Sequence, residues 1–324
     1  MVCGHVIGST AAAGMEVADD SAWRLFYVAL EDIRMPLFTV ISGFVYAMRP
    51  IGAAADVPGL ILAKIRRLLF PLITVGALMF LLEFEVPGTH DKQNPSHFWR
   101  IYAFPYEHLW FLQAIFLVFV VVALLDAVGL LSTRSRALLA IAISSVLAIV
   151  ISVPLNMDVF SVGSAVYLLP FFLIGYLLTR YRALEDWRWA FVVGPVFLLL
   201  YGMRLAMVFD IWHPHEALDR TIGLCVGITG VTLLFLARRL IRCRPLTWIG
   251  GFAFGIYLLH VFGAAAARMA VHRLGISADV VVFTISLAAG VVAPIIFQLV
   301  FGRFGWVRTF ILGEKAHPKT PANA

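Results

Sequence analysis

Apolar stretches of nearly membrane-crossing length recur along almost the whole chain. A helix needs about 17–25 predominantly apolar residues to cross a bilayer. Nine segments approach or reach that length, at residues 35–48, 68–82, 109–131, 137–153, 162–179, 189–209, 221–237, 246–267 and 280–301. Polar loops separate them, and they lack the two-residue alternation of membrane β-strands. Because backbone groups in lipid must be hydrogen-bonded within their own segment, we expect an all-α polytopic membrane protein.

The composition agrees with this prediction. Of the 324 residues, 61% are hydrophobic and only 14% are charged, and the mean hydropathy is +0.92. Soluble domains carry about 25% charged residues, so the bilayer must be the solvent for most of this chain. An apolar N-terminal stub, residues 1–14, predicts most of a further helix that lacks its first half. The expected fold is therefore a bundle of about ten transmembrane helices, the first truncated, forming one domain over residues 1–313 with a polar tail at 314–324.

The basic residues predict the orientation, because positive side chains gather in cytoplasmic loops. Counted through the nine segments, 17 of the 25 basic residues share the side of the C-terminus. The other eight are Arg24, Arg34, Lys92, Arg100, Arg204, Arg220, Arg268 and Arg273. We expect a multi-pass protein of the inner (plasma) membrane with a cytoplasmic C-terminus. The formal charge of +6 is then a topology signal and indicates no nucleic-acid partner.

The cysteines and the N-terminus carry little further information. Cys3, Cys225 and Cys243 are widely spaced and predict neither a disulfide framework nor a zinc site, so no metal is expected. The start of the chain lacks a basic region before its apolar residues, so we expect no signal peptide.

Two histidines lie in apolar segments, where ionisable side chains are costly and are functional candidates by default. His5 lies in the N-terminal stub, and His260 ends the run Tyr257-Leu-Leu-His260. An imidazole with an ordinary pKa of about 6.5 can be neutral at pH 7 and accept a proton from a hydroxyl. Such a ring suits a general base or an acyl-carrying nucleophile. A hydrogen bond across helices is the alternative role for either residue.

Three other features have both a functional and a structural interpretation. Lys64, Arg66 and Arg67 stand at the predicted cytoplasmic mouth, where they can bind a phosphate-bearing ligand or simply mark the topology. Ser42 and the glycine after it allow close helix packing. Trp110 belongs to an aromatic cluster with His108 and Phe111 that is typical of an interfacial anchor.

The order of these features resembles the acyltransferase-3 family of membrane proteins, which acylate hydroxyls of surface glycans. The match runs through His5, then MPLF at 35–38 with Ser42, and Arg66-Arg67 before a proline. It continues with LWFL at 109–112, PFFLIGY at 170–176 and the segment 250–260. No single motif is diagnostic, but six of them occur in register over nearly the whole chain.

The resemblance implies ten helices with both ends cytoplasmic, and a one-protein reaction. An acyl group, acetyl above all, passes from cytosolic acyl-CoA to a hydroxyl of an extracytoplasmic glycan or lipid-linked sugar. Carried onto this chain, the family pattern makes His5 catalytic and assigns Arg66 and Arg67, with Lys64 beside them, to the donor. His260, Tyr257, Ser42 and Trp110 are expected to line or support the site.

Two departures from the family pattern keep other functions open. Family members carry an arginine about eleven residues before the first histidine, whereas here four residues precede His5, and Ala253 replaces a frequent serine. Either half a helix is missing or the chemistry is impaired. The alternatives are a non-catalytic glycan-binding or assembly subunit, and a transporter of a polar solute, which the absence of an internal repeat disfavours. The acceptor, the acyl chain and the oligomeric state are not predicted.

Overall fold

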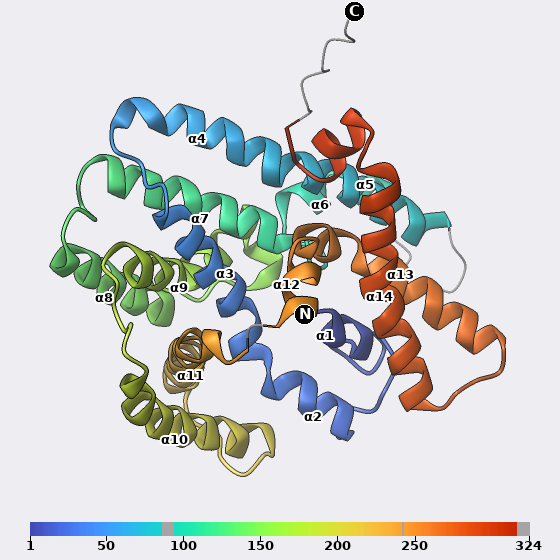
Figure 1. Ribbon diagram of the computed structural model, residues 1–324. Coiled ribbons are helices and arrows are strands. Elements are labelled where there is room, and N and C mark those ends of the chain that lie inside the picture. Colours follow the sequence, from blue (N-terminus) through green and yellow to red (C-terminus); the bar gives the residue numbers. More distant parts are fainter. Residues whose placement is uncertain (86–93, 242, 316–324) are drawn as a thin grey trace, which may run out of the picture. The chain divides into compact units, whose positions relative to one another are not determined.

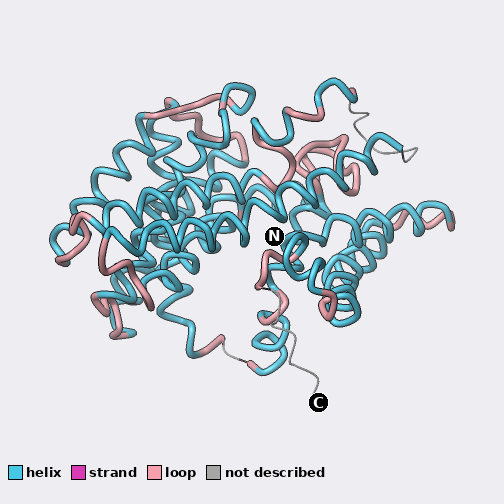
Figure 2. The backbone as a smooth tube through the Cα atoms, turned by 90° about the horizontal axis from the view of Figure 1, so that it is seen from above, coloured by secondary structure: helices cyan, strands magenta, loops and turns pink. Residues whose placement is uncertain are grey.

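The computed structural model describes residues 1–85, 94–241 and 243–315, and all regular elements in these ranges are helical. The all-α prediction is therefore confirmed. Lys92, Arg242 and residues 316–324 of the predicted tail lie outside the described residues. Figures 1 and 2 show helices joined by short loops. The α-helices are α1 (Val2–Ile7), α2 (Ala22–Ala29), α3 (Glu31–Ala47), α4 (Val57–Lys64), α5 (Phe70–Glu85), α6 (Arg100–Ala103), α7 (Trp110–Ala127), α8 (Arg134–Val150), α9 (Val162–Arg180), α10 (Ala190–Val208), α11 (Glu216–Leu236), α12 (Arg244–Gly250), α13 (Ala253–Arg273) and α14 (Asp279–Phe301).

Seven helical segments within the described ranges are long and apolar enough to cross a membrane. They are Ala54–Glu85, Trp110–Ala127, Val159–Arg180, Trp187–Val208, Glu216–Leu236, Ala253–Arg273 and Asp279–Phe301. Helices α3 and α8 have 17 residues each, at the lower limit for a crossing. All nine predicted apolar segments thus fall on helices.

Two predicted boundaries are wrong. The segment 246–267 is not one helix, because α12 ends at Gly250 and α13 begins at Ala253. A pair of glycines at this junction lowers the helix propensity and allows the break. At the N-terminus, the helix within the stub 1–14 has only six residues and ends at Ile7, and the next residue, Gly8, has a φ of +92°.

The chain divides into two compact units. The first unit comprises Met1–Ala18, Leu62–Leu112 and Pro245–Ala324. Its centre is the helix pair α13 and α14, and α1 packs against both of these helices. Small residues allow the close approach: a Cβ added at Gly263 would lie 2.6 Å from the carbonyl oxygen of Ala289, and one added at Gly290 would lie 2.9 Å from Val2.

The second unit comprises Asp19–Ile61 and Gln113–Arg244. Helices α3 and α9 pack most closely, with Gly43 against the carbonyl of Phe172 and Gly175 against that of Val40. The prediction that the glycine after Ser42 serves close packing is confirmed. A partly buried ion-pair group, in which Arg204 binds Asp32 (2.6 Å) and Asp219 (2.5 Å), joins α10 to α3 and α11.

We expect Gly263→Leu to destabilise the detergent-solubilised protein by about 1–3 kcal/mol, because the side chain must push α14 away from α13. The measurement is the thermal unfolding midpoint followed by size-exclusion chromatography. Gly194→Leu in α10 is the matched control, since nothing lies within 4 Å of a Cβ added there. Equal shifts in both variants would contradict the close α13–α14 packing.

Candidate active site

Three histidines from separate parts of the chain meet in the first unit. His5 comes from α1, His108 from the turn before α7, and His260 from the middle of α13. The ring centroid of His5 lies 5.7 Å from that of His108 and 4.9 Å from that of His260, and the last two are 4.8 Å apart. His108 is 2% exposed and His260 is fully buried. These three residues are called the histidine cluster below.

The backbone of α13 determines which nitrogen of His260 carries the proton. Nδ1 lies 3.0 Å from the carbonyl oxygen of Ile256 and 2.8 Å from that of Tyr257. Because carbonyl oxygens only accept hydrogen bonds, Nδ1 is the protonated nitrogen. Nε2 of the neutral ring is then an acceptor, and this buried atom has no partner within the described residues.

His108 is held by α13 in a similar way. Its Nε2 donates to the carbonyl oxygen of Leu258 at 3.3 Å, and its own carbonyl accepts a 2.5 Å hydrogen bond from the Tyr257 hydroxyl. Burial, and then the neighbouring His260, lower the pKa of His108 well below its ordinary value, so the ring is neutral at pH 7. Its Nδ1 is therefore a second buried acceptor without a partner in the described part of the chain.

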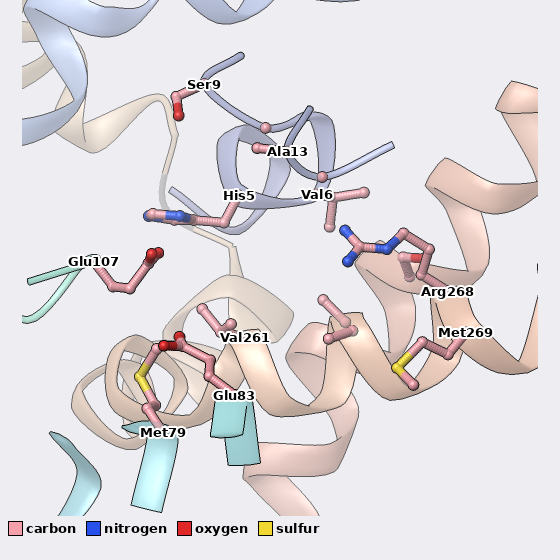
Figure 3. Close-up of a pocket in the computed structure, with 15 residues that line it drawn as sticks. His5, Val6, Ser9, Ala13, Met79, Glu83, Glu107, Val261, Arg268 and Met269 are labelled. Carbon is pink, nitrogen blue, oxygen red and sulfur yellow. The ribbon is translucent and has the colours of Figure 1, made fainter. Parts of the chain in front are cut away.

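A pocket of about 220 Å³ opens beside His5 (Figure 3). Its lining comes from α1 and the loop after it, the end of α5, the turn before α7, and facing sides of α13 and α14. Gly8 and Gly14 shape the loop after α1: both have positive φ, and a Cβ at either would clash with the backbone of the other end of the loop. The amide of Met15 donates to the carbonyl of Ile7 (3.2 Å), which closes this loop.

Charged side chains enter the pocket from two sides. Figure 3 shows the carboxylates of Glu83 and Glu107 on the side of the His5 ring, and the guanidinium of Arg268 on the opposite side. Glu83 accepts a 2.6 Å hydrogen bond from the hydroxyl of Tyr106. Burial, and then this hydrogen bond, raise the pKa of Tyr106, which stays protonated and remains the donor. Glu107 has a φ of +44°, a conformation that is uncommon outside glycine.

Lys64, Arg66 and Arg67, called the basic cluster below, reach the other end of α13 through Arg67. The guanidinium of Arg67 sits 3.9 Å from the ring centroid of Phe254, one residue into α13. His260 follows six residues later and Arg268 eight residues after that, which is about 9 Å and about 12 Å along the axis. One helix thus carries a contact of the basic cluster, the histidine cluster and the pocket in that order.

The C-terminal segment packs onto this basic cluster. Arg67 donates to the carbonyl of Leu312 at 2.7 Å. The carboxylate of Glu314 lies between two guanidiniums, 3.7 Å from Arg67 and 3.0 Å from Arg308. Gly313 has a φ of +61° and touches the backbone of Arg67, where a Cβ would lie 2.5 Å from the carbonyl oxygen. Both arginines belong to π-helical turns, Ile65–Leu69 and Val307–Ile311, a local structure frequent at functional sites.

The structure gathers some of the predicted site residues and not others. His5, His260 and Tyr257 meet in and around the histidine cluster, and Lys64, Arg66 and Arg67 lie together where α4 meets the π-helical turn. Trp110 contacts Phe111 at a centroid distance of 6.1 Å and does not line the pocket. The residue of its motif that joins the site is His108, which the anchor interpretation overlooked.

Ser42 belongs to the second unit, and its hydroxyl donates to the carbonyl of Phe38 in its own helix at 2.9 Å. Its predicted supporting role stays a prediction. Within the described ranges, no group of three or more His, Cys, Asp and Glu side chains is placed to hold a metal ion.

The comparison with known families decides the class of protein. Residues 1–299 match a family model described as an acyltransferase domain. The chain belongs to the acyltransferase-3 family. No curated protein and no solved structure matched the chain. The predicted resemblance is confirmed, and this acyltransferase-3 protein is a multi-pass membrane acyltransferase with an acyl donor and an acceptor as its substrates.

We expect His108→Phe to lower both stability and acyl transfer. Phenylalanine keeps a planar ring but removes the N–H that the carbonyl of Leu258 accepts, a net loss of about 0.5–1.5 kcal/mol because this carbonyl keeps its hydrogen bond within α13. The unfolding midpoint and the transfer rate, expected to fall about tenfold or more, are the measurements. His97→Phe is the matched control on an exposed turn. Identical behaviour of the two variants would contradict a role for His108 in the site.

Proposed function

We propose that this protein is an O-acyltransferase that moves an acyl group, acetyl in the first instance, from cytosolic acyl-CoA to a hydroxyl of an extracytoplasmic glycan or lipid-linked sugar. His5 is its catalytic residue. The protein works in the inner membrane with the C-terminal segment on the cytoplasmic side.

The observation that carries this proposal is the order of features along α13. Phe254 contacts Arg67 at one end of the helix, His260 reaches His5 in the middle, and Arg268 lines the pocket toward the other end. A transferase that works across a bilayer needs a donor site, a reactive group and an acceptor site in this order.

His5 is the ring of the cluster that lines the pocket, whereas His108 and His260 are buried behind it. In the proposed reaction, His5 takes the proton of the acceptor hydroxyl as the oxygen attacks the thioester carbonyl. The C–S bond breaks, an ester C–O bond forms, and the CoA thiolate leaves and receives a proton. Histidine is therefore neutral again after each turnover, and no further reactant is needed.

The unpaired acceptors of His108 and His260 support His5 in this role. Their N–H groups point to backbone carbonyls, so only acceptor atoms remain for the interior of the cluster. A nitrogen atom that can accept a hydrogen bond stabilises a neighbouring imidazolium more than a neighbouring neutral imidazole. Both rings thereby favour the protonated form that His5 reaches in the transition state.

The basic cluster supports binding of the phosphate-bearing donor. Guanidiniums bind phosphate oxygens strongly, and the carboxylate of Glu314 between Arg67 and Arg308 marks a position suited to an anion. A donor phosphate that takes this position must displace Glu314.

The test of the reaction uses the full chain in proteoliposomes with labelled acetyl-CoA and a surface-glycan extract. We expect label in an alkali-labile ester on the glycan, and a decrease of at least 100-fold in His5→Gln, the range typical of a lost general base. His272→Gln, at the exposed end of α13, is the control and is expected to keep full activity. Transfer by folded His5→Gln at the native rate would refute the role of His5. Absence of transfer in the native protein with several acyl donors would refute the proposed reaction.

The donor site is tested by the KM for acyl-CoA. Arg67→Gln removes a charge-assisted contact of about 1.5–3 kcal/mol, so KM is expected to rise about tenfold or more. Glu314→Gln removes the competing carboxylate and is expected to lower KM. Arg303 is an exposed arginine near the π-helical turn Val307–Ile311, and Arg303→Gln controls for the loss of one positive charge. Equal KM values for all three variants would place the donor elsewhere.

A further inference from the structure

The pocket beside His5 has a lining that discriminates by charge. We infer that it is the acceptor subsite of this transferase and that it takes one sugar ring that is neutral or amine-bearing and excludes a ring that carries a carboxylate. This inference rests on the proposed function because it names the bound sugar as the acceptor, but binding of the sugar ring itself does not depend on the reaction.

A buried hydroxyl without a partner points to a polar ligand. Ser286 lines the pocket from α14 and is 1% exposed, and its Oγ has no hydrogen-bond partner within the described residues. A buried hydroxyl without a partner costs about 1–3 kcal/mol, so such groups are normally satisfied by water or ligand. The hydroxyl of a sugar can donate to Ser286 or accept from it.

The two carboxylates face the reactive ring from neighbouring elements. Glu83 is positioned by the Tyr106 hydroxyl at 2.6 Å, and Glu107 directly precedes His108 in the chain. Figure 3 shows both carboxylates on the side of the pocket where the His5 imidazole lies. Vicinal hydroxyls of a sugar, or an ammonium group, can donate to these oxygens. The same oxygens repel a carboxylate brought to the ring of His5.

Arg268 does not reverse this preference. Its guanidinium is the one arginine in the lining and lies opposite the glutamates. Glu16 also interacts electrostatically with Arg268, which offsets part of its positive charge. The positive N-terminal amino group acts on His260, which does not line the pocket. Two carboxylates on the side of His5 against one partly neutralised guanidinium therefore make the lining acidic there.

The size of the pocket suits one ring and not an extended chain. Its volume of about 220 Å³ is many times that required by one water molecule. Ser9, at the exposed edge of the lining, belongs to the loop after α1 and marks where the rest of a glycan can leave the pocket.

Binding can be measured without turnover by protection of a cysteine at this edge. Ser9→Cys is introduced into full-length protein whose Cys3, Cys225 and Cys243 are replaced by alanine, and its rate of maleimide labelling is followed. The probes are methyl glucoside, methyl glucosaminide and methyl glucuronide, with their galacto counterparts, which share one ring and differ in charge. We expect a several-fold slower labelling with the neutral and amine-bearing probes and no protection by the uronides.

The charge dependence is tested by Glu83→Gln and Glu107→Gln in the same background. We expect the double variant to admit the uronides and to lose the advantage of the glucosaminide. Glu85→Gln, an exposed glutamate at the end of α5, is the matched control and is expected to keep the native order. Ser286→Ala is expected to weaken protection by every probe, whereas Thr284→Ala on the exposed side of α14 is not.

Each outcome decides one of the two proposals. Equal protection by neutral and acidic probes, protection by none of them, or a native preference retained in the double glutamate variant would overturn the acceptor subsite. Selective protection without any acyl transfer would keep the subsite and refute the proposed reaction. Acyl transfer that prefers uronides would keep the reaction and overturn the charge selection inferred here.

Discussion

In the interior of a membrane protein, water is scarce and polar groups must find partners within the chain. In the candidate site of this acyltransferase-3 protein, His108 and His260 meet that constraint with one ring nitrogen and not with the other. His260 donates to carbonyls of its own helix, and His108 donates to the carbonyl of Leu258. These bonds determine the tautomer and orientation of both rings. The second nitrogen of each ring is left as an acceptor beside His5, and the proposed chemistry uses that unsatisfied capacity.

The geometry of α13 relates the three parts of the site. It is one uninterrupted helix, Ala253–Arg273, and it carries Phe254, His260 and Arg268 at intervals of about two turns. Its close contact with α14 depends on Gly263 and Gly290, and the second of these glycines also receives Val2 of α1. A larger side chain at this crossing would move α1, and with it His5, away from His260. The glycines of the membrane helices therefore contribute to the site by setting the distances between its helices.

The basic cluster depends on backbone geometry in the same sense. A π-helical turn carries Arg66 and Arg67 at the start of α5, and the C-terminal segment closes over it through Gly313 and the carbonyl of Leu312. Glu314 then shares its carboxylate between Arg67 and Arg308. Long cationic side chains lose much conformational freedom when they bind, and positioning them beforehand reduces that loss. In the proposed donor site, the arginines are thus already arranged.

The sequence by itself determined the all-helical membrane fold, because apolar length and backbone satisfaction in lipid leave few alternatives. It also singled out His5, His260 and the run from Lys64 to Arg67 as candidates, because charged or titratable groups are rare in apolar segments and stand out there. It did not identify His108, whose position next to Trp110 has the composition of an interfacial anchor. It placed one helix across residues 246–267, where local glycines divide α12 from α13. Only the tertiary structure decided that His108 faces His5 and His260, that Glu83 and Glu107 share a pocket with His5, and that Glu314 lies between Arg67 and Arg308. These contacts join residues far apart in the chain, and apolar periodicity, which is a local property, contains no information on which helices meet.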